Sequence, residues 1–433
     1  MDPSAEEGQP AAEDDLERRE AEYEAFVWKN LRRNYAGHYL HGMMGMTGFR
    51  LINAPTFLPA YLHQLSGSNT IVGLGLALQQ LGGVISPIVG ATQVEHRRTV
   101  MPAAVWIGGL ARIQIIGMAM AGWFLAPKPA TVAIIAFMFL FGLFMGAQRV
   151  VFSVLLAKVI PISRRGRLQA WRNATGGLIA AGLAYLAGRY FIEANLFGNG
   201  YSTTFVFAFA LTSLGLTALR VLMIEPEPPT VRPQTRLAQR VREFPALLAD
   251  RDFSRFMIAQ MLATAARMAI PFYVIYASAT IKLTGSNLGL LTVAYLGADT
   301  LSNLLWGYLG DRKGFRLILM VSVALWIAST VLLVTSTDLA LFCAAFFGLG
   351  AAQSGYMMSA QTMILEFGSR DEMAMRIALS STAEGIMASL GPLAGGLIST
   401  HFGYPPMFMV SVVFLMLSLV VLTRVREPRR SRL

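Results

Sequence analysis

Four ionisable residues stand inside long apolar stretches of this chain: Arg50, Arg267, Asp299 and Glu384. A charge at the centre of a lipid bilayer costs ~2.5 kcal/mol or more, so ionisable residues there are rare and tend to mark a solute or ion pathway. The two arginines could bind an anion. The two carboxyl groups could carry a proton, because the proton affinity of a buried carboxylate depends on whether an arginine lies beside it.

Two neutral polar residues extend this set. Asn53 follows Arg50 by three residues and shares its helix face, and Gln353 could hydrogen-bond a solute or another helix. The candidates for solute binding are thus Arg50, Asn53, Arg267 and Gln353, and those for proton coupling are Asp299 and Glu384. A purely structural role stays open for each arginine, as part of a buried ion pair. Asp299 in particular could simply neutralise Arg267.

The composition is typical of a membrane protein. Hydrophobic residues make up 55% of the chain and charged residues 14%, with a mean hydropathy of +0.52, whereas about a quarter of a soluble domain is charged. The net charge of +11 resides in short loops beside apolar stretches, where cations orient helices in a bilayer rather than bind nucleic acid. The one cysteine, Cys343, excludes an internal disulfide and a cysteine metal cluster. Walker, H-E-x-x-H and nucleophile-elbow motifs are absent, so we expect neither an enzyme nor a cofactor or metal.

Twelve apolar stretches are each long enough to cross a hydrocarbon core ~30 Å thick. Their alternation with short polar breaks predicts an all-α polytopic membrane protein with twelve transmembrane helices. The predicted spans are residues 38–63, 70–93, 99–124, 131–157, 168–192, 204–224, 254–280, 287–309, 317–336, 339–365, 377–399 and 406–423. Arg50 and Arg267 fall near the middle of the first and seventh spans, which puts both near the centre of the bilayer.

The loops predict the orientation. Nearly all loop cations fall in the breaks at residues 95–98, 158–167, 311–316 and 369–376 and in the C-terminal tail, residues 425–433. The opposite breaks hold Lys128 and Lys282, so the positive-inside rule makes both termini cytoplasmic. Residues 1–37 lack the pattern of a signal peptide. We expect them to form a cytoplasmic tail, disordered at first and then folded as a short interfacial helix.

The two halves of the chain repeat one another. LSGSN at 65–69 recurs 218 residues later as LTGSN at 283–287, GAQR at 146–149 matches AAQS at 351–354, and Thr175-Gly176 matches Glu384-Gly385, each following an arginine by eight residues. Such a repeat predicts two pseudo-symmetric six-helix bundles, residues 38–224 and 253–424. The segment between them, residues 225–252, starts with prolines and then shows helical apolar spacing. This pattern predicts a cytoplasmic linker with an amphipathic helix.

The polar loop GYLGDRKGFR, residues 307–316, links the eighth and ninth predicted spans. We expect Gly307 and Gly310 to allow a close approach of two helices and Gly314 to allow a turn with positive φ. Asp311 could make a contact with the positive end of a neighbouring helix that breaks and re-forms. Together with Arg312, these residues are the gating candidates of this loop.

The pattern G-x-x-x-D-R-x-G-x-R in this loop, the twelve spans and the repeat together resemble the major facilitator superfamily over about residues 38–424. The resemblance implies a solute carrier that alternates between inward-open and outward-open states by rocking one half against the other. It also implies that spans 1, 4, 7 and 10 line a central cavity. Asp311 would then face the end of the fifth span, near residues 164–167.

The matching loop of the first half departs from this pattern. It reads GATQVEHRR, residues 90–98, with no Asp-Arg pair and no second glycine. Glu95 could take the part of the aspartate, and Arg149, near the end of the fourth span, could serve gating or structure. We therefore expect an asymmetric gate in which Asp311 dominates.

These observations favour a secondary active transporter for a small, anionic organic solute, working by proton-coupled symport. We expect a monomer in a bacterial inner membrane, whose partners are the solute, a proton or another cation, and the lipid bilayer. One alternative is an efflux carrier for amphipathic compounds or lipids, although the fifth span, GGLIAAGLAYLAG, lacks the Gly-Pro signature that proton-driven efflux members of the family carry. A second alternative is a receptor or assembly factor that keeps the scaffold without transport.

Overall fold

The computed structural model describes residues 8–94, 97–228, 247–367 and 373–426, and all regular structure within these ranges is helical. The first half contains α1 (Gly8–Lys29), α2 (Leu31–Asn53), α3 (Phe57–Ser66), α4 (Asn69–Val94), α5 (Met101–Phe124), α6 (Pro127–Val159), α7 (Ile162–Leu186), the π-helical η2 (Ala187–Ile192), the short η3 (Leu196–Gly198) and α8 (Gly200–Leu222). The second half contains α11 (Arg251–Ala266), the 3-10 helix η4 (Arg267–Phe272), α12 (Tyr273–Thr280), α13 (Gly285–Lys313), α14 (Phe315–Thr335), α15 (Leu339–Glu366), α16 (Met373–Phe402) and α17 (Tyr404–Thr423).

The predicted all-α architecture of twelve membrane helices in two bundles is confirmed. By length and composition alone, nine segments within the described ranges could cross a membrane. The three remaining spans are α2 with α3, which is interrupted, and α7 and α16, which carry charged residues. Hydropathy alone therefore misses these three spans.

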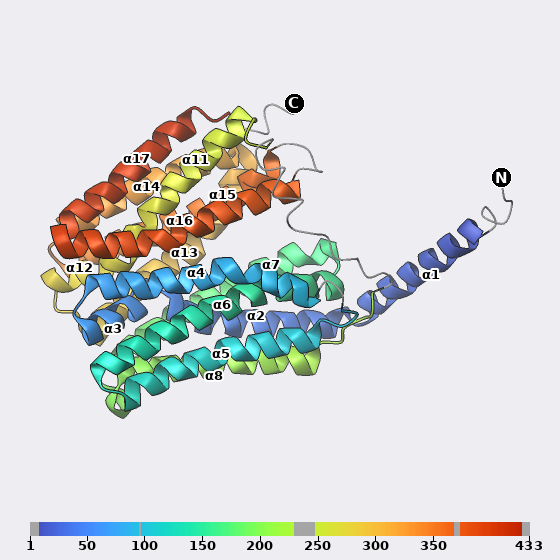
Figure 1. Ribbon diagram of the computed structural model, residues 1–433, viewed down its shortest axis with the longest axis horizontal. Coiled ribbons are helices and arrows are strands. Elements are labelled where there is room, and N and C mark those ends of the chain that lie inside the picture. The colour runs from blue at the N-terminus through green and yellow to red at the C-terminus, as the bar shows by residue number, and fades with distance from the viewer. Residues whose placement is uncertain (1–7, 95–96, 229–246, 368–372, 427–433) are drawn as a thin grey trace.

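The two bundles lie side by side (Figure 1), with α4 packed against α16 and α7 against α13. The start of α2 and the end of α17 lie at the same end of the molecule, which we call the proximal end. The opposite end, with the α3–α4 and α16–α17 connections, is the distal end. Toward the proximal end the ribbons of the two halves separate (Figure 1).

At the distal end the halves are held together by direct contacts. Thr70 and Thr400 share a hydrogen bond of 2.9 Å between their hydroxyl groups, and the Tyr404 hydroxyl donates to Asn69 Oδ1 at 3.0 Å. A Cβ atom added to Gly188 would lie 2.3 Å from the Gly285 carbonyl oxygen, so only glycine allows η2 to approach α13 this closely. The molecule is thus closed at its distal end.

Both pseudo-symmetric spans that carry a central arginine are broken, which corrects the prediction of continuous spans at 38–63 and 254–280. The first breaks between Asn53 and Phe57, around Pro55, and the residue before this proline has the extended conformation that proline favours. The second becomes a 3-10 helix at Arg267, and Pro271 within it has no N–H to donate to the Arg267 carbonyl group. Each break opens the backbone beside the arginine.

The proximal connections are shorter than predicted, because the helices continue through the polar residues. α13 runs to Lys313 and α14 starts at Phe315, so Gly314 alone makes the turn, with φ of 91°. The predicted positive φ at Gly314 is confirmed, whereas the predicted ten-residue loop is wrong. Likewise α7 starts at Ile162, within the predicted break at residues 158–167. Charged residues past the hydrocarbon core can remain helical in the aqueous layer.

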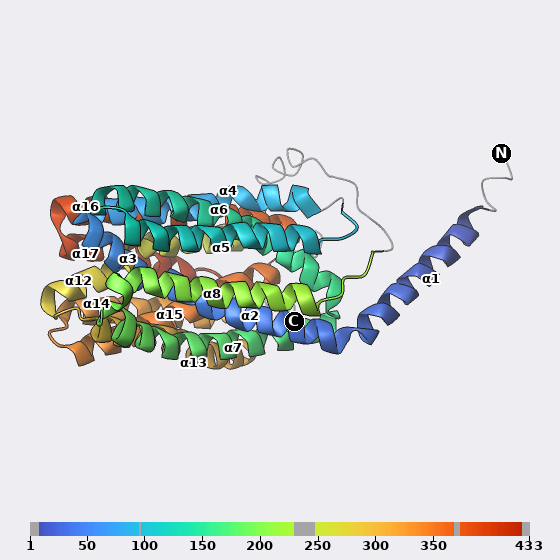
Figure 2. The same ribbon diagram turned by 90° about the horizontal axis from the view of Figure 1, so that it is seen from below.

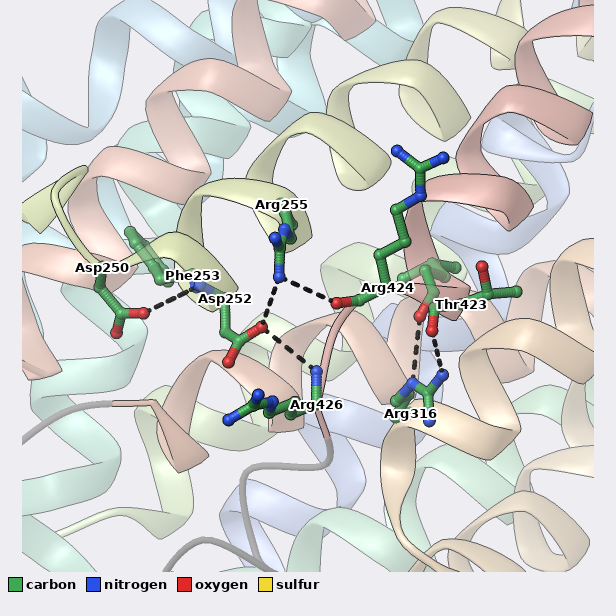
Figure 3. A network of polar contacts seen from close by, with 9 residues as sticks. Asp250, Asp252, Phe253, Arg255, Arg316, Thr423, Arg424 and Arg426 are labelled. Atoms are coloured by element: carbon green, nitrogen blue, oxygen red, sulfur yellow. Dashed lines mark hydrogen bonds and ion pairs between the residues drawn. The ribbon is translucent and has the colours of Figure 1, made fainter.

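The repeat also governs how each half ends at the proximal side. Asn34 Oδ1 accepts a hydrogen bond from the Ile224 backbone at 2.8 Å, and Asp252 Oδ1, 218 residues after Asn34, accepts one from the Arg426 backbone at 3.3 Å. Figure 3 shows the second of these contacts, next to Arg316, which donates to the last carbonyl groups of α17. In each half, a side chain near the start of the first helix therefore accepts a hydrogen bond from the backbone that follows the last helix.

The N-terminal helix begins at Gly8 and projects away from the bundle (Figures 1 and 2). Its sequence is rich in Glu, Arg and Ala, which favour helix without tertiary contacts. The predicted amphipathic helix of the linker falls mostly on residues 229–246, for which the structure gives no description. The linker and the extent of the tails therefore stay predictions.

Candidate functional site

A cavity of about 420 Å³ lies between the two halves, beside both helix breaks. It is bordered by residues of the α2–α3 break, α4, α6, η4, α13, α15 and α16. Six predicted candidates line it: Arg50, Asn53, Arg149, Arg267, Asp299 and Gln353. The structure thus brings together side chains that are up to 303 residues apart in the sequence (353 − 50).

Arg50 forms an ion pair that crosses between the halves. Its Nη1 atom lies 2.9 Å from Asp299 Oδ2 and donates a hydrogen bond of 2.9 Å to Thr300 Oγ1. Gly177 on α7 leaves room for this arrangement, because a Cβ there would lie 2.2 Å from Thr300 Oγ1. If its role were structural, Asp299 was expected to neutralise Arg267. That pairing is wrong, because Asp299 forms its ion pair with Arg50.

Arg267 pairs within its own half. Its Nη1 atom lies 3.4 Å from Glu384 Oε1 on α16, and Gln260 Nε2 donates to the other carboxylate oxygen at 3.3 Å. Ser380 in turn donates to Gln260 Oε1 at 2.7 Å. Glu384 is therefore bonded by both Arg267 and Gln260. Within the described part of the chain, Asp299 has no supporting pair of this kind.

Both ion pairs are partly exposed, and Arg50, Asp299 and Arg267 line the cavity. The side chains of Arg50 and Asp299 are 21% and 22% exposed, and those of Arg267 and Glu384 are 24% and 23% exposed. A solute that enters the cavity could therefore compete with a carboxylate for its arginine. Two arginines balanced by two acids, with Arg149 added on the wall, leave this region with one excess positive charge.

The neutral polar residues complete the wall. Gln79 Nε2 donates to Asn53 Oδ1 at 2.8 Å, which joins α4 to the end of α2. Gln353 Oε1 is buried and, among the described residues, has no hydrogen-bond partner. Tyr295 also lines the cavity. An unpartnered amide oxygen at the cavity wall is suited to accept a hydrogen bond from a solute.

Sequence reasoning missed Gln260, Tyr295 and Thr300 as members of the site. Gln260 precedes Arg267 by seven residues, two helical turns, and could have been placed on the same face from spacing alone. Thr300 directly follows Asp299, so its position at the arginine depends on the rotation of α13 and had no comparable signal.

Among the described gating candidates, Gly307, Asp311, Arg312 and Gly314 lie at the proximal end, whereas Arg149 lines the cavity. Asp311 and Arg312 are exposed on the last turn of α13, where the Arg312 guanidinium lies over the Tyr308 ring at 4.3 Å. A Cβ on Gly307 would meet Met358 at 3.8 Å, an ordinary contact, so the predicted close approach is wrong at Gly307. At Gly310 a Cβ would lie 2.4 Å from the Phe315 ring on α14, so the close approach holds there. Glu95 belongs to residues that the structure leaves undescribed. The contact of Asp311 with residues 164–167 stays a prediction.

Comparison with known proteins fits this architecture. Residues 40–266 and 255–433 match the sequence profile of the Major Facilitator Superfamily. The chain belongs to this superfamily. It is therefore an integral membrane protein and a transporter rather than an enzyme.

Solved structures of this superfamily have the same fold. A mutant form of the nucleoside transporter NupG matches with a TM-score of 0.70 and 15% identity, covering 90% of this chain and 98% of that one. A D-xylose-proton symporter matches with a TM-score of 0.67 and 15% identity, over 93% and 98%. The human organic anion transporter MFSD10 matches with a TM-score of 0.60 and 14% identity, over 90% and 99%. At these identities the likeness concerns the fold alone.

Among curated relatives, the Multidrug resistance protein MdtG of Escherichia fergusonii is 34% identical over 119 residues, which cover 27% of this chain and 28% of that protein. The MdtG protein of Salmonella choleraesuis is 35% identical over 115 residues, covering 25% and 28%. The matched stretch thus spans less than a third of the length of these relatives.

Proposed function

We propose that the protein is a secondary active carrier that moves a small organic anion together with a proton. The observation that carries this proposal is the pair of cavity-lining arginines at the helix breaks, each bonded to a carboxylate, Arg50 to Asp299 and Arg267 to Glu384. In this proposal Asp299 carries the coupled proton. The anion binds between Arg50 and Arg267, and Glu384 holds Arg267 in orientation.

Exchange of partners at Arg50 explains the coupling. A proton on Asp299 neutralises the carboxylate and weakens its bond to Arg50, and the anion then supplies the negative charge that Arg50 has lost. A carrier with a protonated Asp299 and no anion would leave an uncompensated cation in the membrane, which is costly. Proton and anion therefore bind together or not at all, and the empty carrier returns with the Arg50–Asp299 pair restored.

The same exchange links binding to movement, because Asp299 and Arg50 belong to different halves. Protonation loosens a contact between the halves, and the anion replaces it with a bridge through the cavity. The positive-inside rule puts the proximal end in the cytoplasm of a bacterium, since most loop cations lie there. The described state would then be inward-facing, closed on the outer side by the distal contacts.

The comparisons support transport in general and leave two directions of transport to consider. At 15% identity the D-xylose-proton symporter shares the fold alone, so proton coupling is proposed from the ion pairs. The short match to a multidrug resistance protein, together with Phe141 and Met145 in the cavity wall, supports an efflux carrier for amphipathic compounds as the second candidate. In the described residues nothing favours a receptor without transport activity.

Uptake into proteoliposomes tests the proposal. We expect one class among labelled carboxylates and organic phosphates to accumulate when the outside is acidic. Accumulation should fall about 30-fold or more in Arg50→Ala and Arg267→Ala, because removing one partner of a desolvated charge pair costs about 2 kcal/mol or more. Arg32→Ala, an exposed arginine at the start of α2, is the matched control and should transport normally.

Two results would contradict the anion proposal. Wild-type accumulation in both cavity variants would exclude the arginines as anion ligands. Extrusion of cationic amphipathic dyes that survives Arg267→Ala would favour the efflux candidate instead. Failure of every gradient to drive any solute would favour a receptor.

A further inference from the structure

Two hollows flank α5 on the outer face of the first half. Figure 2 shows α5 at the surface between α6 and α8, and both neighbours pack against it. The hollows have volumes of about 400 and 460 Å³ and share Pro102, Trp106 and Leu110 in their walls. Trp106 stands between them and is 70% exposed. We call the two hollows together the α5 groove.

The walls of the α5 groove are mainly apolar. One side is formed by Met101, Val105 and Ile113, and the other by Ile107, Leu143 and Phe144, apart from the residues that both share. Gly109 lies in the first hollow, and a Cβ added to it would meet nothing within 4 Å. The glycine therefore keeps the groove open without being needed for helix packing. These walls suit hydrocarbon chains better than a polar ligand.

A cation stands at the proximal end of the groove. Arg220, in the last turn of α8, lines the first hollow and is exposed. The other nearby cations already have interactions. Arg97, which lines the second hollow, has one of its own, Lys158 lies 2.7 Å from Glu225 Oε1, and Arg98 lies 3.8 Å from Glu227 Oε2. Among the described residues none forms a hydrogen bond or ion pair with Arg220. Its charge is therefore available to a ligand.

The second hollow contains a further unsatisfied polar group. Ser86 on α4 is 1% exposed and lines this hollow, and its hydroxyl group has no hydrogen-bond partner in the described part of the chain. A buried hydroxyl group without a partner is uncommon and calls for an acceptor. The ester carbonyl group of a lipid, which lies just below the headgroup, is an acceptor of the right kind.

We propose that the α5 groove binds one anionic phospholipid, with its phosphate on Arg220 and its acyl chains on the two sides of Trp106. A headgroup at Arg220 lies at the membrane surface, where basic residues attract anionic lipids. Tryptophan is enriched at the same depth, because its ring is apolar and its N–H polar. The chains then run along α5 toward Ile113, away from the charged end. This site is separate from the central cavity and does not depend on the transported solute.

Native mass spectrometry of the full-length protein tests this site. The purified carrier is exchanged into detergent with equal amounts of phosphatidylglycerol and phosphatidylcholine that have the same acyl chains, and the lipids retained on it are counted. We expect wild-type protein to retain one phosphatidylglycerol in preference to phosphatidylcholine. Arg220→Gln should weaken that retention about five-fold, the equivalent of about 1 kcal/mol for one arginine near an anionic headgroup.

A second variant removes the space rather than the charge. Gly109→Leu fills the groove and should abolish retention of both lipids while the protein folds, since leucine is a better helix former than glycine. Gly182→Leu is the matched control, because Gly182 is exposed on α7 with open space around it. Arg32→Gln controls for removal of an exposed proximal arginine. Both controls should retain phosphatidylglycerol as the wild type does.

Three outcomes would overturn the proposal. Equal retention of the two lipids by wild-type protein would mean that the groove holds bulk lipid only. Unchanged retention in both Arg220→Gln and Gly109→Leu would place the lipid elsewhere. A dimer in the wild-type spectrum that becomes a monomer in Gly109→Leu would assign the groove to a second copy of the chain.

Discussion

The two central ion pairs stand on related helices but connect different parts of the molecule. Arg50 reaches Asp299 across the boundary between the halves at 2.9 Å, whereas Arg267 reaches Glu384 within the second half at 3.4 Å. The repeat explains the difference. The position of the first half that matches Glu384 is Thr175, which has no charge to offer Arg50.

In the proposed mechanism this difference gives the two ion pairs different roles. A contact across the boundary changes whenever the halves move, so its protonation state and the conformation of the carrier depend on one another. A contact within one half travels with that half and is kept in place by Gln260 and Ser380. Coupling in the proposed mechanism therefore belongs to the Arg50–Asp299 pair and solute orientation to the Arg267–Glu384 pair.

The largest effect is expected from Asp299→Asn. The amide cannot take up the coupled proton and leaves Arg50 without a counter-charge in the empty carrier, which blocks its return. Accumulation driven by a pH gradient should be abolished, while exchange of labelled for unlabelled solute, which needs no empty return, should persist. Paired assays of accumulation and exchange in one batch of proteoliposomes check this. Loss of both activities would mean that Asp299 is needed for binding or folding rather than for coupling.

A smaller effect is expected from Glu384→Gln. Loss of the carboxylate leaves Arg267 poorly oriented, so the KM for the solute should rise about 30-fold, the equivalent of about 2 kcal/mol. The accumulation ratio at saturating solute should stay near that of the wild type, because Asp299 still carries the proton. If Glu384→Gln and Asp299→Asn abolish accumulation alike, the division between the two pairs is wrong.

Gln260→Leu should have a milder effect on the same pair. It removes one hydrogen bond to Glu384, and a typical net value of about 1 kcal/mol predicts a KM about five-fold higher. The turnover number and the response to a pH gradient should be unchanged. Kinetics at several solute concentrations separate the two quantities, and an altered pH response would show that Glu384 takes part in coupling.

The smallest effect concerns the distal contact between the halves. Glu193 accepts hydrogen bonds from the Ser286 hydroxyl group and from its backbone at 2.8 Å. The hydroxyl bond first, and then the backbone bond, lower the pKa of Glu193 below its usual value. The ionised form therefore stabilises the closed distal end, and this stabilisation is lost as the pH falls through the lowered pKa.

Spin labels can follow this opening. Cysteines that replace Lys128 and Lys282, exposed distal residues of the two halves, are labelled in a Cys343→Ser background. Because the pKa of Glu193 is lowered, their separation should lengthen only at pH values below the usual glutamate range, and Glu193→Gln should lengthen it modestly at neutral pH. An unchanged distance in Glu193→Gln would mean that the glycine and threonine contacts alone close the distal end.

The sequence predicted the helices and the charged residues of the cavity wall, because apolar stretches, the charges within them and the repeat are visible in the sequence. Arg50, Asn53, Arg267 and Gln353 were selected from their positions in spans, and all four line one cavity. The pairing of acids with arginines could not be predicted. It depends on the rotation of α13 and α16, which brings Arg50 to a residue 249 positions away (299 − 50) and Arg267 to one 117 away. The helix breaks were missed although Pro55 and Pro271 are present, because proline is also tolerated within membrane helices.

The most direct test of proton and anion coupling through Asp299 drives transport with a gradient of the solute instead of a gradient of pH. Proteoliposomes that contain a pH-sensitive dye receive an inward gradient of the transported solute, with equal pH on both sides at the start. We predict that solute entry acidifies the interior in wild-type vesicles, and that Asp299→Asn vesicles show no acidification. Solute entry into wild-type vesicles without a change in internal pH would contradict proton symport.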